Sequence, residues 1–192
     1  MVVSVETFTA DDGELLIHTG VTGPAARTGH RLTIAVRAWT ATVTVDDGTP
    51  TAVAATIVVD SLDVTAGTGG LTPMTGPERA MARSNALKSL KAKKFPEITF
   101  AASDVAESAG GYRLTGMLTI AGTTREQIVD IATDESHLTF DVALTQSDFG
   151  VKPYSLAMGT LKVADEVRLT LDVTRTHPRP PAAGQATERS LS

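Results

Sequence analysis

The stretch His30-Arg31-Leu32-Thr33-Ile34-Ala35-Val36-Arg37-Ala38 places the large apolar side chains of Leu32, Ile34 and Val36 at every second position. Successive side chains of an extended chain point to opposite sides, so this period of two is typical of a strand with one buried face. The same alternation recurs in residues 113–120, 138–144 and 167–174. Together these segments predict an antiparallel sheet that buries one apolar face.

Outward from these strands, the sequence holds further, less regular strand candidates. They are residues 13–19, 41–45, 51–62, 97–105 and 125–133. Turn sequences such as Asp46-Asp47-Gly48 and Gly110-Gly111 separate them. Many strands with a turn signal roughly every 8 to 12 residues predict a barrel or a sandwich.

One segment, residues 77–90, lacks alternation and is rich in helix-forming residues. Pro77 suits the first turn of a helix, with Thr75 or Gly76 as the N-cap, and Pro96 ends anything helical before it. We therefore predict one short helix over the sheet. The apolar residues expected to form its packing stripe are Ala80, Leu87 and Leu90.

The composition excludes several classes of protein. No run approaches the roughly 18 apolar residues of a membrane helix, and the chain has no cysteine for a disulfide or a thiolate site. A net charge of −5 and only 4% aromatic residues argue against nucleic-acid binding, which needs basic faces and stacking rings. Residues 1–12 lack the basic and apolar regions of a secretory signal, so we expect a cytoplasmic location.

Catalytic and metal sites find little support in the sequence. The four histidines are scattered without metal-binding spacing, so we expect no metal and no cofactor. An enzymatic alternative would combine His18 or His30 with Asp60 or Asp148 for proton transfer. The glycine-rich residues 66–73 lack the spacing of a phosphate-binding motif and are predicted to be a loop.

Basic side chains gather in and after the predicted helix. Six of the seventeen basic residues fall between positions 79 and 94, namely Arg79, Arg83, Lys88, Lys91, Lys93 and Lys94. The run could bind an anionic head group or the negative surface of a membrane. Alternatively it is a solvated helix face, with lysines that complement the helix dipole.

Four motifs, in order, resemble the YceI family. They are Asp60-Ser61-Leu62, Phe95-Pro96-Glu97-Ile98-Thr99-Phe100, the hairpin Gly116–Thr124, and Ser147-Asp148-Phe149-Gly150. Their order and spacing agree with the family over about residues 14–175. The chain is similar to a cytoplasmic type of member.

The resemblance implies an all-β fold, an extended antiparallel eight-stranded lipocalin-like barrel with one short helix. It assigns residues 1–177 to this barrel domain and leaves residues 178–192 as a disordered C-terminal tail. Family members are associated with isoprenoid chains, lipids and related amphiphiles, and no catalytic set is implied. An eight-stranded barrel is wide enough for one such chain.

The resulting expectation is a non-enzymatic carrier with a long apolar ligand in the barrel lumen. The alternative is a scaffold or stress-response interaction module whose barrel is closed and filled. The expected lumen residues are Leu32, Ile34, Val36, Ile57, Val59, Ile98, Phe100, Leu114, Leu118, Ile120, Leu138, Phe140, Leu169 and Leu171. Head-group candidates are His30, Arg83 and Lys88. Expected partners are a lipid or isoprenoid and, transiently, an anionic membrane surface, and a homodimer is left open.

Overall fold

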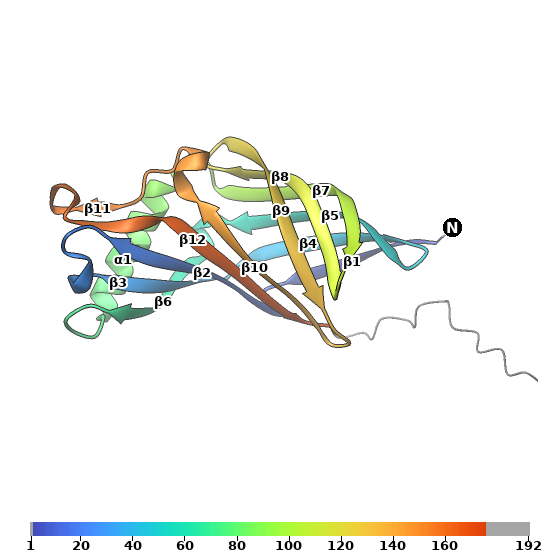
Figure 1. Cartoon of the computed structure of the whole chain (residues 1–192), viewed down its shortest axis with the longest axis horizontal. Helices are drawn as coiled ribbons and strands as arrows, with labels where there is room; N and C mark the ends of the chain where they lie inside the picture. Colours follow the sequence, from blue (N-terminus) through green and yellow to red (C-terminus); the bar gives the residue numbers. More distant parts are fainter. Residues whose placement is uncertain (1, 176–192) are drawn as a thin grey trace, which may run out of the picture.

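The computed structural model describes residues 2–175, which form one curled antiparallel sheet and one α-helix (Figure 1). The strands are β1 Val3–Thr9, β2 Gly13–Thr22, β3 His30–Val36, β4 Trp39–Asp46, β5 Thr49–Val58, β6 Leu62–Gly69, β7 Glu97–Ser108, β8 Gly111–Ile120, β9 Thr123–Thr133, β10 His137–Thr145, β11 Ser155–Leu156 and β12 Leu161–Thr174. Helix α1 spans Gly76–Ser89. Four short 3-10 turns are η1 Ala26–Thr28, η2 Val59–Ser61, η3 Gln146–Phe149 and η4 Ala157–Gly159. The predicted all-β class with one helix is confirmed.

Six of these strands are halves of three longer, bent strands. Strand β1 leads into β2, β3 into β4, and β5 into β6, each across two or three residues. Strand β1 pairs with β4 and β2 with β3, so the first bent strand pairs with the second along both of its halves. Strand β4 pairs with β5 and β3 with β6, so the second bent strand pairs with the third in the same way. With each bent strand counted once and the two-residue β11 set aside, the described chain has the eight long strands that were predicted.

The sheet curls until its first and last long strands meet. Strand β5 pairs with β7, the order continues through β8, β9, β10 and β12, and β12 pairs with β2. Along this path β9 and β10 share two residue pairs, Leu138 with Thr133 and Thr139 with Ala132. The barrel wall is therefore loosest between β9 and β10.

The bends reset the inward and outward alternation. Val36 and Trp39 are both buried although they are three residues apart, because residues 37 and 38 lie outside the strands. The bends of adjacent strands are hydrogen-bonded to each other: Arg37 N donates to Ser61 O at 3.1 Å. Unbroken alternation from Leu32, Ile34 and Val36 would place Trp39 on the outer face of the barrel. The break in the strand explains why it is buried.

Two sequence-predicted boundaries are corrected, and one strand was not predicted. The strand predicted over residues 51–62 ends at Val58, because the next residues form η2, where the Ser61 hydroxyl donates to Val58 O at 2.7 Å. Strand β6 continues to Gly69, so half of the loop predicted over residues 66–73 is strand. Strand β1 was missed because Ser, Glu and Thr interrupt its apolar residues, which are mostly exposed.

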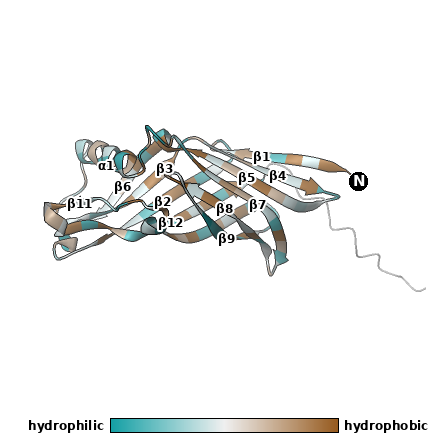
Figure 2. Cartoon of the chain, turned by 90° about the horizontal axis from the view of Figure 1, so that it is seen from above, coloured by the Kyte–Doolittle hydropathy of each residue, from teal (hydrophilic) through white to brown (hydrophobic). Residues whose placement is uncertain are grey.

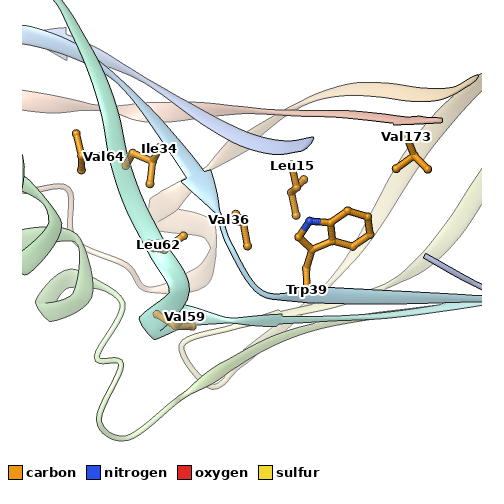
Figure 3. Close-up of a cluster of buried hydrophobic side chains, with 8 residues drawn as sticks. All are labelled: Leu15, Ile34, Val36, Trp39, Val59, Leu62, Val64 and Val173. Carbon is orange, nitrogen blue, oxygen red and sulfur yellow. The ribbon is translucent and has the colours of Figure 1, made fainter. Parts of the chain in front are cut away.

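The barrel interior is filled away from α1. A central cluster contains the buried side chains of Leu15, Val36, Trp39 and Val173 (Figure 3). Beyond it, a further cluster of Ala102, Tyr112, Leu114 and Val129 fills the end of the barrel near the turn between β7 and β8. Within residues 2–175, the part of the barrel interior that these clusters leave unfilled lies beneath α1.

Helix α1 is capped at its N-terminus and bound to the strand beneath it. A capping box joins Thr75 and Glu78, in which Thr75 N donates to the Glu78 carboxylate at 2.7 Å. The Arg83 guanidinium reaches the strand below and donates to Leu62 O at 2.7 Å. The predicted stripe is partly wrong: Leu87 and Leu90 pack against the core, whereas Ala80 is exposed. The face that α1 presents to the barrel is instead built around Ala82 and Ala86.

Candidate functional site

A cavity of about 670 Å³ lies between α1 and the inner wall of the barrel. Its roof is one face of α1, with side chains three or four positions apart: Glu78, Met81, Ala82, Asn85, Ala86, Ser89 and Leu90. Three of these, Ala82, Ala86 and Ser89, are small, and the described helix has no fully buried residue. The helix therefore covers the barrel end without filling it.

Seven of the fourteen predicted lumen residues line this cavity. They are Leu32, Ile34, Ile57, Ile98, Leu118, Ile120 and Leu169. The other seven pack in the filled part: Val36, Val59 and Leu114 are buried there, and Phe100, Leu138, Phe140 and Leu171 pack against the clusters. Strand alternation identified the inner face, but it does not distinguish a packed position from a cavity wall.

Several lining residues were missed because they lie outside the strands. Phe149 is 3% exposed and lines the cavity from η3, which ends at Gly150 with a φ of 67°. Val151 follows it, and Leu71 and Met74 line the cavity from the segment before α1. The Asp-Phe-Gly sequence signalled the turn, but the alternation rule cannot predict which way a 3-10 turn directs its side chain.

Of the three head-group candidates, His30 alone borders the cavity. Its Nε2 lies 2.8 Å from Thr72 O, which fixes the ring at the start of β3. The other two lie outside the cavity wall: Arg83 is engaged with Leu62 O and with Asp60, and Lys88 is exposed on α1. The Arg83 side chain therefore anchors the helix.

A second polar group, Glu78, stands beside His30 at the same end. Hydrogen bonds from the backbone and hydroxyl of Thr75 hold the pKa of the Glu78 carboxyl below its usual range, and the nearby His30 lowers it further. Glu78 is therefore an ionised carboxylate whose charge is largely used in capping the helix.

The enzymatic alternative finds no assembled pair in the described residues. His18 lies 3.1 Å through Nε2 from the Thr170 hydroxyl, and neither it nor His30 has a hydrogen bond or ion pair to Asp60 or Asp148. Within residues 2–175 no three metal-binding side chains come together, and no helix is long and apolar enough to cross a bilayer.

A family model described as "YceI-like domain" matches residues 14–175. The chain belongs to the YceI-like family. The resemblance predicted from the four motifs is confirmed, with the same residue range. No curated protein matches the chain in a sequence comparison.

Solved structures share the YceI-like fold at low sequence identity. Burkholderia cenocepacia BcnA has a TM-score of 0.64 and 20% identity, covering 90% of this chain and 100% of BcnA. The Campylobacter jejuni YCEI protein has a TM-score of 0.54 and 20% identity, covering 74% and 82% of the two chains. A mutant of that protein was solved with a monobromobimane guest, and it has a TM-score of 0.57, the same 20% identity and the same coverage of the two chains. At this identity the likeness concerns the fold.

The YceI-like motifs contact one another in space. A Cβ added at Gly116 would lie 2.7 Å from Phe100 Cζ, and one added at Gly122 would lie 2.6 Å from the ring of Phe95. The glycines of the Gly116–Thr124 hairpin thus leave room for the phenylalanines of the preceding motif. Phe95 also packs in the cluster with Phe149, so three of the motifs build the cavity end of the barrel.

Proposed function

We propose that this YceI-like protein binds one long apolar chain, an isoprenoid or another lipid, in the cavity beneath α1 and carries it without chemical change. The observation that carries the proposal is the 670 Å³ cavity with a predominantly apolar wall. Each buried methylene group stabilises a bound chain by about 0.8 kcal/mol, so such a wall favours long hydrocarbons. The scaffold alternative requires a filled interior, against which this cavity argues.

The volume sets the expected size of the ligand. A water molecule occupies about 30 Å³, and a methylene group is of similar size, so the cavity has room for roughly 20 such groups. The central cluster around Trp39 closes the cavity toward the filled end. We therefore propose a single chain of that order of length, with its polar end beside His30 and Glu78.

The test measures uptake of cis-parinaric acid, a fluorescent fatty acid, by the full chain. Ala86→Phe places a large ring in the cavity roof and should weaken binding about tenfold or more, because the ring occupies volume that the chain needs. Ala80→Phe is the matched control, since Ala80 is exposed on the same helix outside the cavity wall. Equal affinity of the two variants would place the ligand elsewhere.

Chain length provides an independent measurement. Competition by saturated fatty acids from lauric to lignoceric, and by farnesol and geranylgeraniol, should show affinity that rises with length and then levels off. No displacement by any of these chains would overturn the carrier proposal. The fluorescence of Trp39, the single tryptophan, reports binding without an added probe, because partly buried cavity residues such as Ile57 pack against its cluster.

The expected cytoplasmic location stays a prediction, which cell fractionation tests.

A further inference from the structure

Large apolar side chains stand exposed around the mouth of the cavity. Leu71 is 81% exposed, Met81 64%, Leu156 51% and Tyr154 36%, and all four also line the cavity. They come from the segment before α1, from α1 itself and from the β11 region, which Figures 1 and 2 place at the same end of the molecule. An apolar ring at an opening is typical of an interaction surface.

Met158, on the turn after β11, extends this apolar rim. Its side chain is fully exposed, and its backbone has a φ of 51°, in the left-handed region that is costly for a residue other than glycine. Folding alone gives no reason to hold a methionine in this conformation with its side chain in water. We call Leu71, Met81, Tyr154, Leu156 and Met158 the mouth rim.

The charge around the mouth rim is opposite to that of the whole chain. The three segments that form the mouth, residues 25–29, 70–81 and 152–162, contain four bases and one acid, although the chain carries a net charge of −5. The bases are Arg27, Arg79, Lys152 and Lys162, all exposed. The single acid, Glu78, is engaged in the capping box. The mouth therefore presents apolar side chains flanked by positive charge.

We propose that the mouth rim and these four bases form a docking surface for an anionic lipid bilayer, through which the cavity loads and unloads its chain. Apolar side chains inserted among lipid tails and cations facing anionic head groups are the two contributions that hold a protein on such a surface. Tyr154 is suited to the boundary because it has an apolar ring and a polar hydroxyl. The loading role rests on the proposed carrier function, whereas the docking itself does not.

This surface shares Arg79 alone with the basic run identified in the sequence. Lys88 and the lysines at positions 91, 93 and 94 lie at or beyond the C-terminal end of α1, whereas Met81 and Arg79 lie near its start. A helix of 14 residues is about 21 Å long at 1.5 Å per residue, so most of the run is displaced from the mouth. The proposal therefore assigns docking to bases that are scattered in the sequence.

The experiment measures binding of the ligand-free full chain to vesicles made of equal parts phosphatidylglycerol and phosphatidylcholine. Leu71→Ser combined with Met158→Ser should lower partition by about tenfold for each side chain, because burial of one large apolar side chain corresponds to that factor or more. Met117→Ser combined with Ile128→Ser is the matched control, since both residues are exposed on the outer barrel wall. The control pair should bind vesicles like the parent.

The charges are tested separately. Lys152→Gln with Lys162→Gln should lower partition by about fivefold per charge, since each base near an anionic surface contributes about that factor. Lys93→Gln with Lys94→Gln should have a much smaller effect, and neutral phosphatidylcholine vesicles should bind every variant weakly. Melting temperatures of all variants confirm that they are folded.

The outcomes separate docking from carrying. Binding of cis-parinaric acid added without vesicles tests the carrier function, and vesicle partition tests the docking. Absence of vesicle binding by a parent that still binds the fatty acid would overturn the docking proposal alone. Equal partition of rim and control variants would also overturn it. A dimer of the parent that the rim variant loses would assign the rim to a second copy of the chain.

Discussion

At the scale of single residues, Gly116 shows how the barrel accommodates its aromatic side chains. A Cβ there would meet Phe100 Cζ at 2.7 Å and Ala101 O at 2.6 Å, both too close for an ordinary contact. The neighbouring strand cannot move away, because Ala102 is paired directly with Gly116. The glycine is therefore required by packing between β7 and β8.

Gly116→Ala should lower the free energy of unfolding by about 1–3 kcal/mol, the usual cost of overpacking a filled interior. Chemical denaturation of the parent and the variant measures this difference. Gly76→Ala is the control, because a Cβ at Gly76, at the start of α1, meets nothing within 4 Å. The control should be as stable as the parent or more so, since alanine is the better helix former. An unchanged free energy of unfolding for Gly116→Ala would show that β7 and β8 shift to accommodate the added methyl group.

Single residues also show where prediction from sequence ends. The inner face could be predicted, since alternation places Leu118 and Leu114 on one side of β8 and both are buried. The sequence does not predict which of the two lines the cavity: Leu118 faces it, whereas Leu114 lies in the filled cluster. Whether an inward-facing residue borders a cavity depends on the size of side chains from other elements. The small Ala86 leaves space in the cavity, whereas the large Tyr112 fills the cluster that contains Leu114.

At the scale of elements, the polar contacts of Arg83 attach α1 to the barrel beside the apolar packing of Leu87 and Leu90. Arg83 donates to Leu62 O and to the backbone and carboxylate oxygens of Asp60, at the turn between β5 and β6. The Asp60-Ser61-Leu62 motif thus supplies the acceptors that seat the helix. A helix attached in this way can cover a hollow barrel end with small side chains such as Ala82 and Ala86 over the cavity.

Arg83→Gln should destabilise the protein by about 1–3 kcal/mol, because it leaves Leu62 O without its charged donor. Lys88→Gln, on the exposed side of the same helix, should leave the melting temperature nearly unchanged. Thermal unfolding followed by circular dichroism compares the two. Identical melting temperatures would mean that the Arg83 contacts contribute nothing net to stability.

The strands could be predicted as elements, but their bends could not. Residues 30–36 were assigned correctly to a strand, whereas the break at residues 37 and 38 involves a hydrogen bond from Arg37 N to Ser61 O on the next long strand. Such contacts are between residues distant in sequence, and no local pattern reports them. The extent of the cavity depends on the position of α1 over the barrel end, which no strand pattern reports.

At the scale of the whole molecule, ion pairs on the outer wall join neighbouring strands. Arg113 and Asp130 link β8 to β9 at 2.7 Å, and Arg168 pairs with Asp141 between β12 and β10. His137 Nδ1 lies 2.8 Å from the Asp172 carboxylate across the same two strands. These pairs tie stability to pH, although each contributes modestly because it is exposed.

The pKa shifts give the direction of this dependence. Hydrogen bonds from Arg113 and Arg168 lower the pKa values of Asp130 and Asp141, so their stabilisation is present above about pH 4 and is lost as the pH falls through the folded values. The Asp172 hydrogen bond raises the pKa of His137, so its stabilisation is present below about pH 6.5 and is lost as the pH rises through the folded value.

Stability should therefore peak between about pH 4 and 6.5 and decline on both sides. Denaturation at a series of pH values measures the profile, and NMR titration of His137 reports its pKa directly. Asp172→Asn should lower the His137 pKa and remove that residue's decline above pH 6.5 without changing the acid side. An unchanged His137 titration in this variant would contradict the assignment of the shift to Asp172.

The pairing of the first and last long strands has a consequence for biosynthesis. His18 on β2 contacts Thr170 on β12 across 152 positions of sequence, so this junction forms only after the ribosome has delivered β12. Until then the apolar faces of β2 and β3 have no closed interior to enter, and pairings this distant are slow to form. The nascent protein thus passes through an open stage in which apolar strand faces are exposed, and pairing of β12 with β2 removes this exposed, aggregation-prone surface.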